Sequence, residues 1–355
     1  MQRYTLVLIG TWGLLATLVL GVNLLVDPLW YWKGNQISGV NLKFNERESR
    51  LTHLTRHLDA YDCLIFGSSR ATFLQPDSFP GYRCFNLAFS AGQVAEFIAF
   101  ARYLGGLGAN PRLVIVGVDA FNFYDAGRDP LNVPAYLYDG NQPPSLLPRY
   151  VSFDALRFSW RTLSGDSPLP GAYDDRFRGI MLDNAPRFRP DVSLDAEGLS
   201  REDDAARQAR PFNPAYAALY GQLRQQWPQS RFIAYVPPIS AWHVDRFDRL
   251  GVLDGYIAAL HACAPYFDDF WDFSVPSAHT WITTNTHDGT HYSPEANREM
   301  AEIMNGVQAS DFGVKVSTLD LEQHHAAYRK VLARFRDLHP QGAPPIAKSL
   351  SRAKP

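Results

Sequence analysis

Cysteine is scarce in this chain, which contains Cys63, Cys84 and Cys263 in 355 residues. So few thiols exclude a small scaffold built on disulfides, and an odd number leaves at least one unpaired within a monomer. Cys63 and Cys84 lie in apolar, strand-like segments, so we expect both to be buried thiols. A single Cys63–Cys84 bridge is the alternative if the compartment is oxidising.

A strong charge of either sign is also lacking, because the formal net charge is only −2. No basic face with interleaved aromatic residues is present, and this excludes nucleic acid as an expected partner. With 46% hydrophobic and 20% charged residues, the chain is neither disordered nor fibrous in composition. The sequence therefore predicts a folded chain with a substantial core.

Charged side chains are absent from residues 4–26. At about 1.5 Å per residue, this run is slightly longer than a hydrocarbon core of about 30 Å. A cleaved signal peptide is the competing interpretation, but residues 24–27 offer no small-residue cleavage pattern. Aromatic residues at 30–32 follow the run, as at a membrane interface. We expect one transmembrane helix at 4–26, with residues 1–3 in the cytoplasm.

Strand-like and helical patterns alternate after the apolar run, which predicts an α/β fold, a three-layer α/β/α sandwich with a mainly parallel sheet. The expected strands are 62–66, 83–87, 113–118, 231–236 and 267–272, and the expected helices are 46–58, 93–104, 213–227 and 242–262. We expect one domain over 27–312, with an insertion at about 125–212 that includes a helix at 151–164 and borders the site. A C-terminal helical segment at 313–338 and a disordered tail at 339–355 complete the expectation.

A serine follows the first expected strand, in the run Gly67-Ser68-Ser69-Arg70. The carboxyl edge of a parallel sheet is where α/β proteins build their sites. Serine alone is a poor nucleophile, so it needs an imidazole to accept its proton and a carboxylate to orient that imidazole. The later run Asp288-Gly289-Thr290-His291 contains both groups.

Both runs also have a noncatalytic, structural interpretation. Tandem serines after a strand often cap the next helix, and Asp288 with Gly289 can form a simple turn that leaves His291 on the surface. Ser293 and Pro294 form a strong helix start, which fixes the Asp-His run in the loop before a helix. The order of the two runs and this helix start favour catalysis.

Four blocks together resemble those of the SGNH (GDSL-like) hydrolase superfamily, namely 66–70, 86–92, 116–123 and 288–291, and the opening Val26-Asp27-Pro28 adds to the likeness. The membrane-anchored members that accompany polysaccharide O-acetylation and teichoic-acid D-alanylation are the most similar. Ser68 stands where the family usually has Asp, and the third block lacks a clean Gly-x-Asn-Asp. The resemblance implies a flavodoxin-like fold in which Ser69, Asp288 and His291 are catalytic.

The remaining site residues are candidates for binding. Gly92 and the N–H of Ser69 are expected donors to a developing oxyanion, and Asn122 is a third candidate donor or an ordinary loop amide. Arg70 can hold an anionic substrate group or form a structural ion pair, and we favour the structural role. Asp119 is also taken as structural, because a carboxylate would repel an oxyanion.

Histidines give one further alternative. His287, Asp288 and His291 could bind zinc in principle, but no matching Cys or His partner is evident. We therefore expect no metal and no cofactor. His243 lies close to a strand end and is either a pocket residue or an ordinary surface histidine.

The apolar run predicts a single-pass membrane protein, and the resemblance implies that it lies in the inner (cytoplasmic) membrane with its catalytic domain on the periplasmic side. The resemblance implies a serine esterase or O-acyltransferase that acts on an acyl donor and a cell-surface glycan. It also makes a membrane-bound acyltransferase a candidate partner, beside the lipid around residues 4–26. The alternative is a noncatalytic accessory protein of a polysaccharide modification or export assembly.

Overall fold

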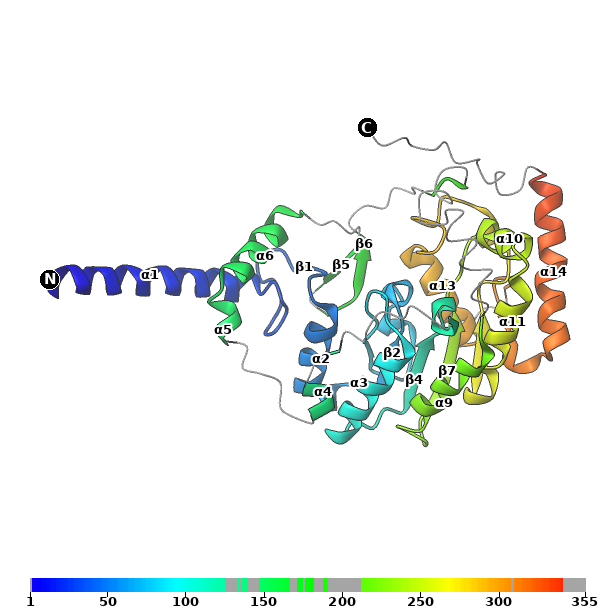
Figure 1. Cartoon of the computed structure of the whole chain (residues 1–355), viewed down its shortest axis with the longest axis horizontal. Coiled ribbons are helices and arrows are strands. Elements are labelled where there is room, and N and C mark those ends of the chain that lie inside the picture. The colour runs from blue at the N-terminus through cyan, green and yellow to red at the C-terminus, as the bar shows by residue number, and fades with distance from the viewer. Residues whose placement is uncertain are drawn as a thin grey trace.

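The chain folds as a mixed α/β protein with one long N-terminal helix (Figure 1). The computed structural model describes residues 2–124, 133–134, 136–139, 147–166, 171–174, 176–181, 188–190, 212–307 and 310–340. Its helices are α1 (Gln2–Val26), α2 (Glu46–Arg56), α3 (Val94–Gly106), α4 (Tyr136–Asp139), α5 (Leu147–Tyr150), α6 (Phe153–Ser164), α9 (Ala218–Arg224), α10 (Ala241–Arg249), α11 (Leu253–His261), α12 (Ala278–Trp281), α13 (Pro294–Met304) and α14 (Leu321–Leu338). Its strands are β1 (Val40–Leu42), β2 (Cys63–Phe66), β3 (Cys84–Asn86), β4 (Leu113–Gly117), β5 (Gly171–Asp174), β6 (Gly179–Met181), β7 (Arg231–Val236), β8 (Asp269–Asp272) and β9 (Val314–Lys315).

The main sheet has six strands in the order β3-β2-β4-β7-β8-β9. The first five are parallel, and only β9 runs antiparallel to its neighbour. The predicted mainly parallel sheet is therefore confirmed, as are the positions of its five predicted strands. Because all their carboxyl ends lie at one edge, the loops after β2, β4 and β7 meet there.

Both faces of the sheet are buried, since β2 and β4 are buried at every position. Alternate residues point to opposite faces, so Leu64 and Val114 belong to one apolar cluster while Ile65 and Ile115 belong to another. Side chains of α3, α9, α10, α11 and α14 join the first cluster, and those of α13 join the second. This two-sided cover explains why the strands are continuous apolar runs.

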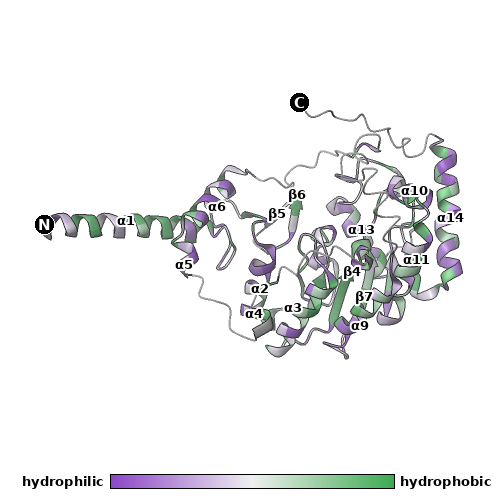
Figure 2. Ribbon diagram, viewed as in Figure 1, coloured by the Kyte–Doolittle hydropathy of each residue, from purple (hydrophilic) through white to green (hydrophobic). Residues whose placement is uncertain are grey.

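Helix α1 projects from the rest of the chain and is apolar along most of its length (Figure 2). It is long and apolar enough to cross a membrane, as expected. Its last turns are held inside the domain, because Asn23 and Val26 are fully buried. The buried carboxylate of Asp27 accepts hydrogen bonds from the N–H groups of residues 31–34 at 2.8–2.9 Å and from the hydroxyl of Tyr150.

A second sheet, not anticipated from the sequence, lies beside this end of α1 (Figure 1). It has the order β1-β5-β6 and is antiparallel. Strand β1 precedes the main sheet, whereas β5 and β6 belong to the expected insertion at 125–212. That insertion lies largely outside the described residues, but α6 agrees with the helix predicted at 151–164.

Two other expectations need correction. The single helix predicted at 242–262 is two helices, α10 and α11, because the chain turns at Gly251 with a φ of +72°. The segment 313–338 is more than a helix, since β9 extends the main sheet and α14 packs Phe335 against Trp242 of α10. Of the tail expected at 339–355, all but the first two residues lie outside the described residues.

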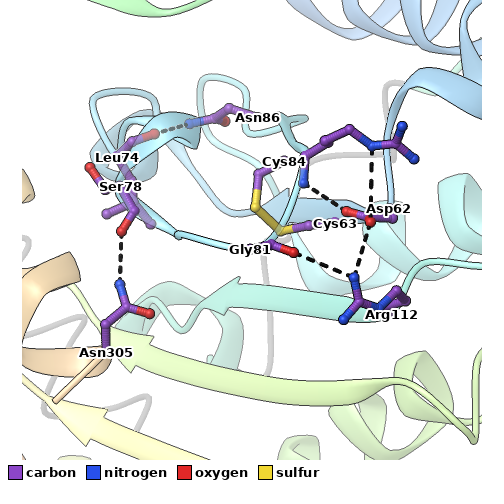
Figure 3. Close-up of a disulfide and its surroundings, with 10 residues drawn as sticks. Asp62, Cys63, Leu74, Ser78, Gly81, Cys84, Asn86, Arg112 and Asn305 are labelled. Atoms are coloured by element: carbon purple, nitrogen blue, oxygen red, sulfur yellow. Dashed lines mark hydrogen bonds and ion pairs between the residues drawn. A yellow bond between two sulfur atoms is a disulfide. The ribbon is translucent and has the colours of Figure 1, made fainter.

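Cys63 and Cys84 are joined by a disulfide, so the expectation of two buried thiols is wrong (Figure 3). The two residues are direct neighbours on the parallel strands β2 and β3, and this register brings their side chains together. Both are buried, and Cys263 is the free, buried cysteine. The bridge closes the loop that carries the serine turn.

Candidate active site

The turn after β2 separates the two serines into different roles. Ser68 is almost fully buried, and its hydroxyl caps a short 3₁₀ turn by accepting the N–H of Arg70 at 3.2 Å. Ser69 begins that turn and is only partly buried. A Cβ on Gly67 would lie 2.4 Å from the Cβ of Ala71, so only glycine allows the strand to turn this tightly. The capping role that we considered for the pair thus belongs to Ser68.

The Asp-His loop is built around a glycine as well. Gly289 has a φ of +86°, and a Cβ there would lie 2.6 Å from Phe188 and 2.8 Å from His243. Its carbonyl accepts the N–H of Ser240, at the start of α10, at 2.7 Å. Ser293 caps α13 by accepting the N–H of Ala296 at 3.3 Å. The hydrogen bond to Ser240 and the capped start of α13 therefore fix the loop that contains His291.

Ser69, His291 and Asp288 form a continuous hydrogen-bonded row. The hydroxyl Oγ of Ser69 lies 2.8 Å from Nε2 of His291, and Nδ1 of His291 lies 2.5 Å from Oδ2 of Asp288. This is the mutual geometry that a nucleophile, a base and an orienting carboxylate require. Ser69 and His291 are 222 positions apart in the sequence, and the structure brings them together as expected.

Asp288 is placed to remain ionised. Burial alone would raise the pKa of its carboxyl, but the hydrogen bond and charge of His291, with the N–H groups of Thr290 and His291, hold that pKa far below its usual range. Those N–H groups lie 2.8 Å and 2.7 Å from Oδ1. An ionised carboxylate fixes the Nδ1–H tautomer, which leaves Nε2 free to accept a proton from Ser69.

Arg70 and Asp119 form a partly buried ion pair beside the row, with Nη1 and Oδ1 3.3 Å apart. Asp119 follows β4 and is buried, and burial raises the pKa of its carboxyl although Arg70 and Ser68 oppose this. The structural role favoured for Arg70 is present in this pair. Arg70 also lines the cavity next to His291, so its side chain is available to a ligand.

The expected oxyanion donors are only partly in place. The N–H of Gly92 donates to the carbonyl of Phe89 at 3.1 Å, and Gly92 is packed against Gly67, so this N–H is engaged within the turn, and its role as an oxyanion donor stays a prediction. Asn122 is buried, and its Oδ1 accepts the N–H of Val94 at 2.9 Å at the start of α3. The N–H of Ser69 donates to none of the described residues and stays a predicted donor.

A cavity of about 460 Å³ opens beside the row. Half of its lining side chains are aliphatic or aromatic, and the other five are polar or charged. The lining residues are Arg70, Ala120, Phe121, Tyr124, Ile239, His243, Phe247, Asp288, Thr290 and His291. Such a mixture suits an acyl group held against a few orienting polar groups.

Sequence reasoning missed the aromatic lining residues. Phe121 lies in the 3₁₀ turn that follows β4 and Tyr124 ends that turn, and their place in the loop after a strand was the available signal. Phe247 lies on α10, and nothing in its sequence neighbourhood sets it apart. From the insertion, the ring of Phe188 stacks on His243 at 5.9 Å and so backs one wall.

The position of His243 decides between its two interpretations. His243 lines the cavity, and its Nδ1 lies 2.7 Å from the hydroxyl of Ser240, so the pocket interpretation is the one observed. In the part of the chain that the structure describes, no three His, Cys, Asp or Glu side chains gather as metal ligands. Both ring nitrogens of His291 are already engaged by Ser69 and Asp288.

No protein-family model, curated protein or solved structure matches this chain.

Proposed function

We propose that this protein is a membrane-anchored serine esterase or O-acyltransferase of the SGNH type. The observation that carries the proposal is the hydrogen-bonded row from Ser69 through His291 to Asp288. A cap or a turn would not require a histidine from a distant loop to meet this serine. The cavity lined by His291 and Asp288 adds space for an acyl group beside this row.

The proposed fold is a flavodoxin-like three-layer sandwich. Numbered from β2, the five parallel strands have the spatial order 2-1-3-4-5, which is the doubly wound order of that fold. In such sheets ligands bind where the strand order reverses, here between β2 and β4. Ser69 follows β2 and Asp119 follows β4, so the proposed site lies at that point.

In the proposed reaction, Ser69 Oγ attacks the acyl carbonyl and passes its proton to Nε2 of His291. Collapse of the tetrahedral intermediate expels the donor alcohol, which receives that proton, and leaves an acyl-Ser69 ester. His291 then takes a proton from water or from a sugar hydroxyl, which attacks the ester and releases Ser69. Asp288 keeps the ring oriented in both steps.

We place this chemistry on the outer side of the cytoplasmic membrane, with α1 as a single-pass anchor and a cell-surface polysaccharide as acyl acceptor or ester substrate. The Cys63–Cys84 disulfide supports an oxidising compartment. The buried end of α1 supports a retained anchor, because cleavage there would remove Asn23 from its hydrogen bond to the Tyr150 carbonyl. A membrane-bound acyltransferase is the proposed partner that would supply acyl groups.

A noncatalytic accessory protein is the second candidate. One observation favours it, namely that the N–H of Gly92 is already bonded to the carbonyl of Phe89. In that case the protein retains the hydrogen-bonded Ser69, His291 and Asp288 but does not catalyse a reaction.

Covalent trapping separates the two candidates. The full chain in detergent micelles would be treated with a fluorophosphonate, and the modified residue located by mass spectrometry. We expect the label on Ser69, with none after His291→Ala, because only an activated serine reacts quickly. Wild-type protein that takes up no label, while a known serine esterase in the same micelles does, would contradict the enzymatic proposal.

A further inference from the structure

Helix α6 is an independently capped element of the insertion. Ser152 begins it by accepting the N–H of Ala155 at 3.1 Å, and Gly165 ends it in a left-handed conformation with a φ of +68°. The start and the end of α6 are therefore set by its own sequence. Much of the chain on either side of it lies outside the described residues.

This helix is fastened to the end of α1. The hydroxyl of Ser159 donates to Oδ1 of Asn23 at 2.8 Å, and Nδ2 of Asn23 donates to the carbonyl of Tyr150 at 2.7 Å, just before α6. Phe158 stacks on Phe44 at 4.4 Å and packs near Leu20 and Leu24. Figure 1 shows α5 and α6 crossing the end of α1. The position of α6 is thus tied to that of α1.

At about 100° per residue, α6 presents three faces. The buried face contains Ala155, Ser159 and Thr162 and packs on the protein. A second face groups the apolar side chains Phe153, Leu156, Trp160 and Leu163. Phe153 is 77% exposed and Trp160 72% exposed. The third face contains Asp154, Arg157 and Arg161.

Exposed apolar side chains concentrate at this end of the molecule. Outside α1, the exposed large apolar residues among those described are Trp32, Ile37, Leu107, Val151, Phe153, Trp160, Leu163, Ile282, Val307, Leu321 and Leu338. More than half of them come from the loop after α1 and from 151–163. Such a gathering is more than the scattered exposure of a soluble surface.

The depth of α6 follows from α1. Every side chain of residues 3–18 is exposed, and burial by the domain begins at residue 19. If Arg3 lies at one membrane surface, a hydrocarbon core of about 30 Å ends about 20 residues later, near Asn23. Asn23 is the residue that holds Ser159. The middle of α6 is therefore level with the opposite membrane surface.

We propose that α6 is a membrane-interface helix, which lies in the outer headgroup region with Phe153, Leu156, Trp160 and Leu163 facing the acyl chains. The proposal rests on the membrane insertion of α1 stated above. An apolar face flanked by arginines is the pattern of interfacial helices, since arginine reaches lipid phosphates while Trp and Phe enter the boundary. With two contacts to the bilayer, the domain would be fixed in orientation and not only tethered.

Site-specific probes on the full chain test this. Single cysteines at Leu14 in α1, Phe153 and Trp160 in α6, and Leu338 in α14 would each be labelled with NBD. The native cysteines are buried or bonded and would not compete. Leu338 is 56% exposed, ends α14, which lies on the side of the domain away from α1 (Figure 1), and is the matched apolar control. Each protein would be reconstituted into vesicles of phosphatidylethanolamine and phosphatidylglycerol, with or without brominated acyl chains.

We expect brominated lipid to quench NBD at 14, 153 and 160, and aqueous iodide to quench it at 338 only. Quenching by lipid at 14 together with quenching by iodide at 153 and 160 would overturn the α6 proposal alone. Loss of lipid quenching at 14 would overturn the membrane anchor and the α6 proposal together. Protection of 153 and 160 from both quenchers would mean that protein, such as a second copy, covers this face, and would also overturn the proposal.

Discussion

Ser68 and Ser69 show how one backbone turn assigns two identical side chains to different tasks. The hydroxyl of Ser68 accepts the N–H of Arg70, whereas that of Ser69 is hydrogen-bonded to His291. The difference arises because Ser68 precedes the 3₁₀ turn and Ser69 starts it.

We expect Ser69→Ala to lower ester hydrolysis by about three to six orders of magnitude, because only binding and oxyanion effects remain without a nucleophile. Turnover of a p-nitrophenyl ester by the full chain would measure this. Ser68→Ala is the matched control, and we expect it to keep most of the activity and to lose about 1 kcal/mol of stability from the missing cap. The reverse pattern would assign the nucleophile to Ser68.

The depressed pKa of Asp288 makes a prediction about pH. A carboxyl whose pKa is lower in the folded than in the unfolded chain stabilises the fold above the unfolded value of about 4, and this contribution is lost as pH falls below it. We expect Asp288→Asn to be less stable than wild type at pH 7, with a difference that shrinks below about pH 4. Urea unfolding between pH 7 and 3 would measure it. Asp59→Asn, at an exposed site, is the control, and a wild-type advantage that does not change with pH would contradict the prediction.

At the scale of elements, the loop between α12 and α13 depends on Gly289. The residue has a positive φ and is also pressed against Phe188 and His243. Gly251, between α10 and α11, has a φ of +72° but open space around it. Substituting alanine for each glycine therefore distinguishes the effect of backbone strain, present at both positions, from the effect of packing, present only at Gly289.

Backbone strain alone would lower the free energy of unfolding by about 1–3 kcal/mol, and we expect Gly289→Ala to lower it by more. The change should also displace His291, so that activity falls by at least about 100-fold. Gly251→Ala should show the strain cost with activity retained. Thermal unfolding and ester turnover of both variants would measure this. Equal losses in the two variants would mean that packing at 289 is unimportant.

The disulfide between β2 and β3 makes a second prediction about elements. In the chain-entropy model, closing a loop with a sequence separation of 21 residues stabilises the fold by about 3 kcal/mol. We expect the double change Cys63→Ala and Cys84→Ala to lose about that amount in urea unfolding, and reductant to destabilise wild type but not the double variant. A double variant as stable as wild type, and still sensitive to reductant, would contradict the bridge.

At the scale of the whole molecule, Asp27 links the apolar helix α1 to the α/β domain. Its two oxygens accept the N–H groups of residues 31–34, and its backbone carbonyl accepts Nδ2 of Asn41 at 2.7 Å. The chain reverses here with a φ of +42° at Asp27 itself. One buried carboxylate thus organises the whole junction.

We expect Asp27→Ala to destabilise this junction by about 3 kcal/mol or more, because several buried donors would lose their acceptor at once. Limited proteolysis of the full chain in micelles should then cleave between α1 and the domain, and thermal unfolding should begin earlier. Asp59→Ala, at an exposed position, is the control and should stay within about 0.5 kcal/mol of wild type. Cleavage that is equally slow in both variants would contradict the prediction.

Local patterns determined much of this protein. An uncharged apolar run long enough to cross a bilayer, short apolar strand-like runs, and the Ser293-Pro294 helix start all predicted elements that the structure contains. These features depend on nearest neighbours and on the period of the side chains, both of which a sequence displays directly. The pairing of Ser69 with His291 was also anticipated, from the order of the two runs, the helix start after His291 and the family resemblance.

Contacts between distant segments were decided only by the tertiary structure. The Cys63–Cys84 bridge depends on the register of two strands, and the hydrogen bond of the Gly92 N–H depends on the carbonyl of Phe89 pointing toward it. The small sheet that joins β1 to β5 and the seat of α6 on Asn23 connect residues more than 100 positions apart. The periodicity of a sequence reports local structure and says nothing about how far apart two distant segments lie. Strand register, packing partners and backbone direction are therefore set only in the folded chain.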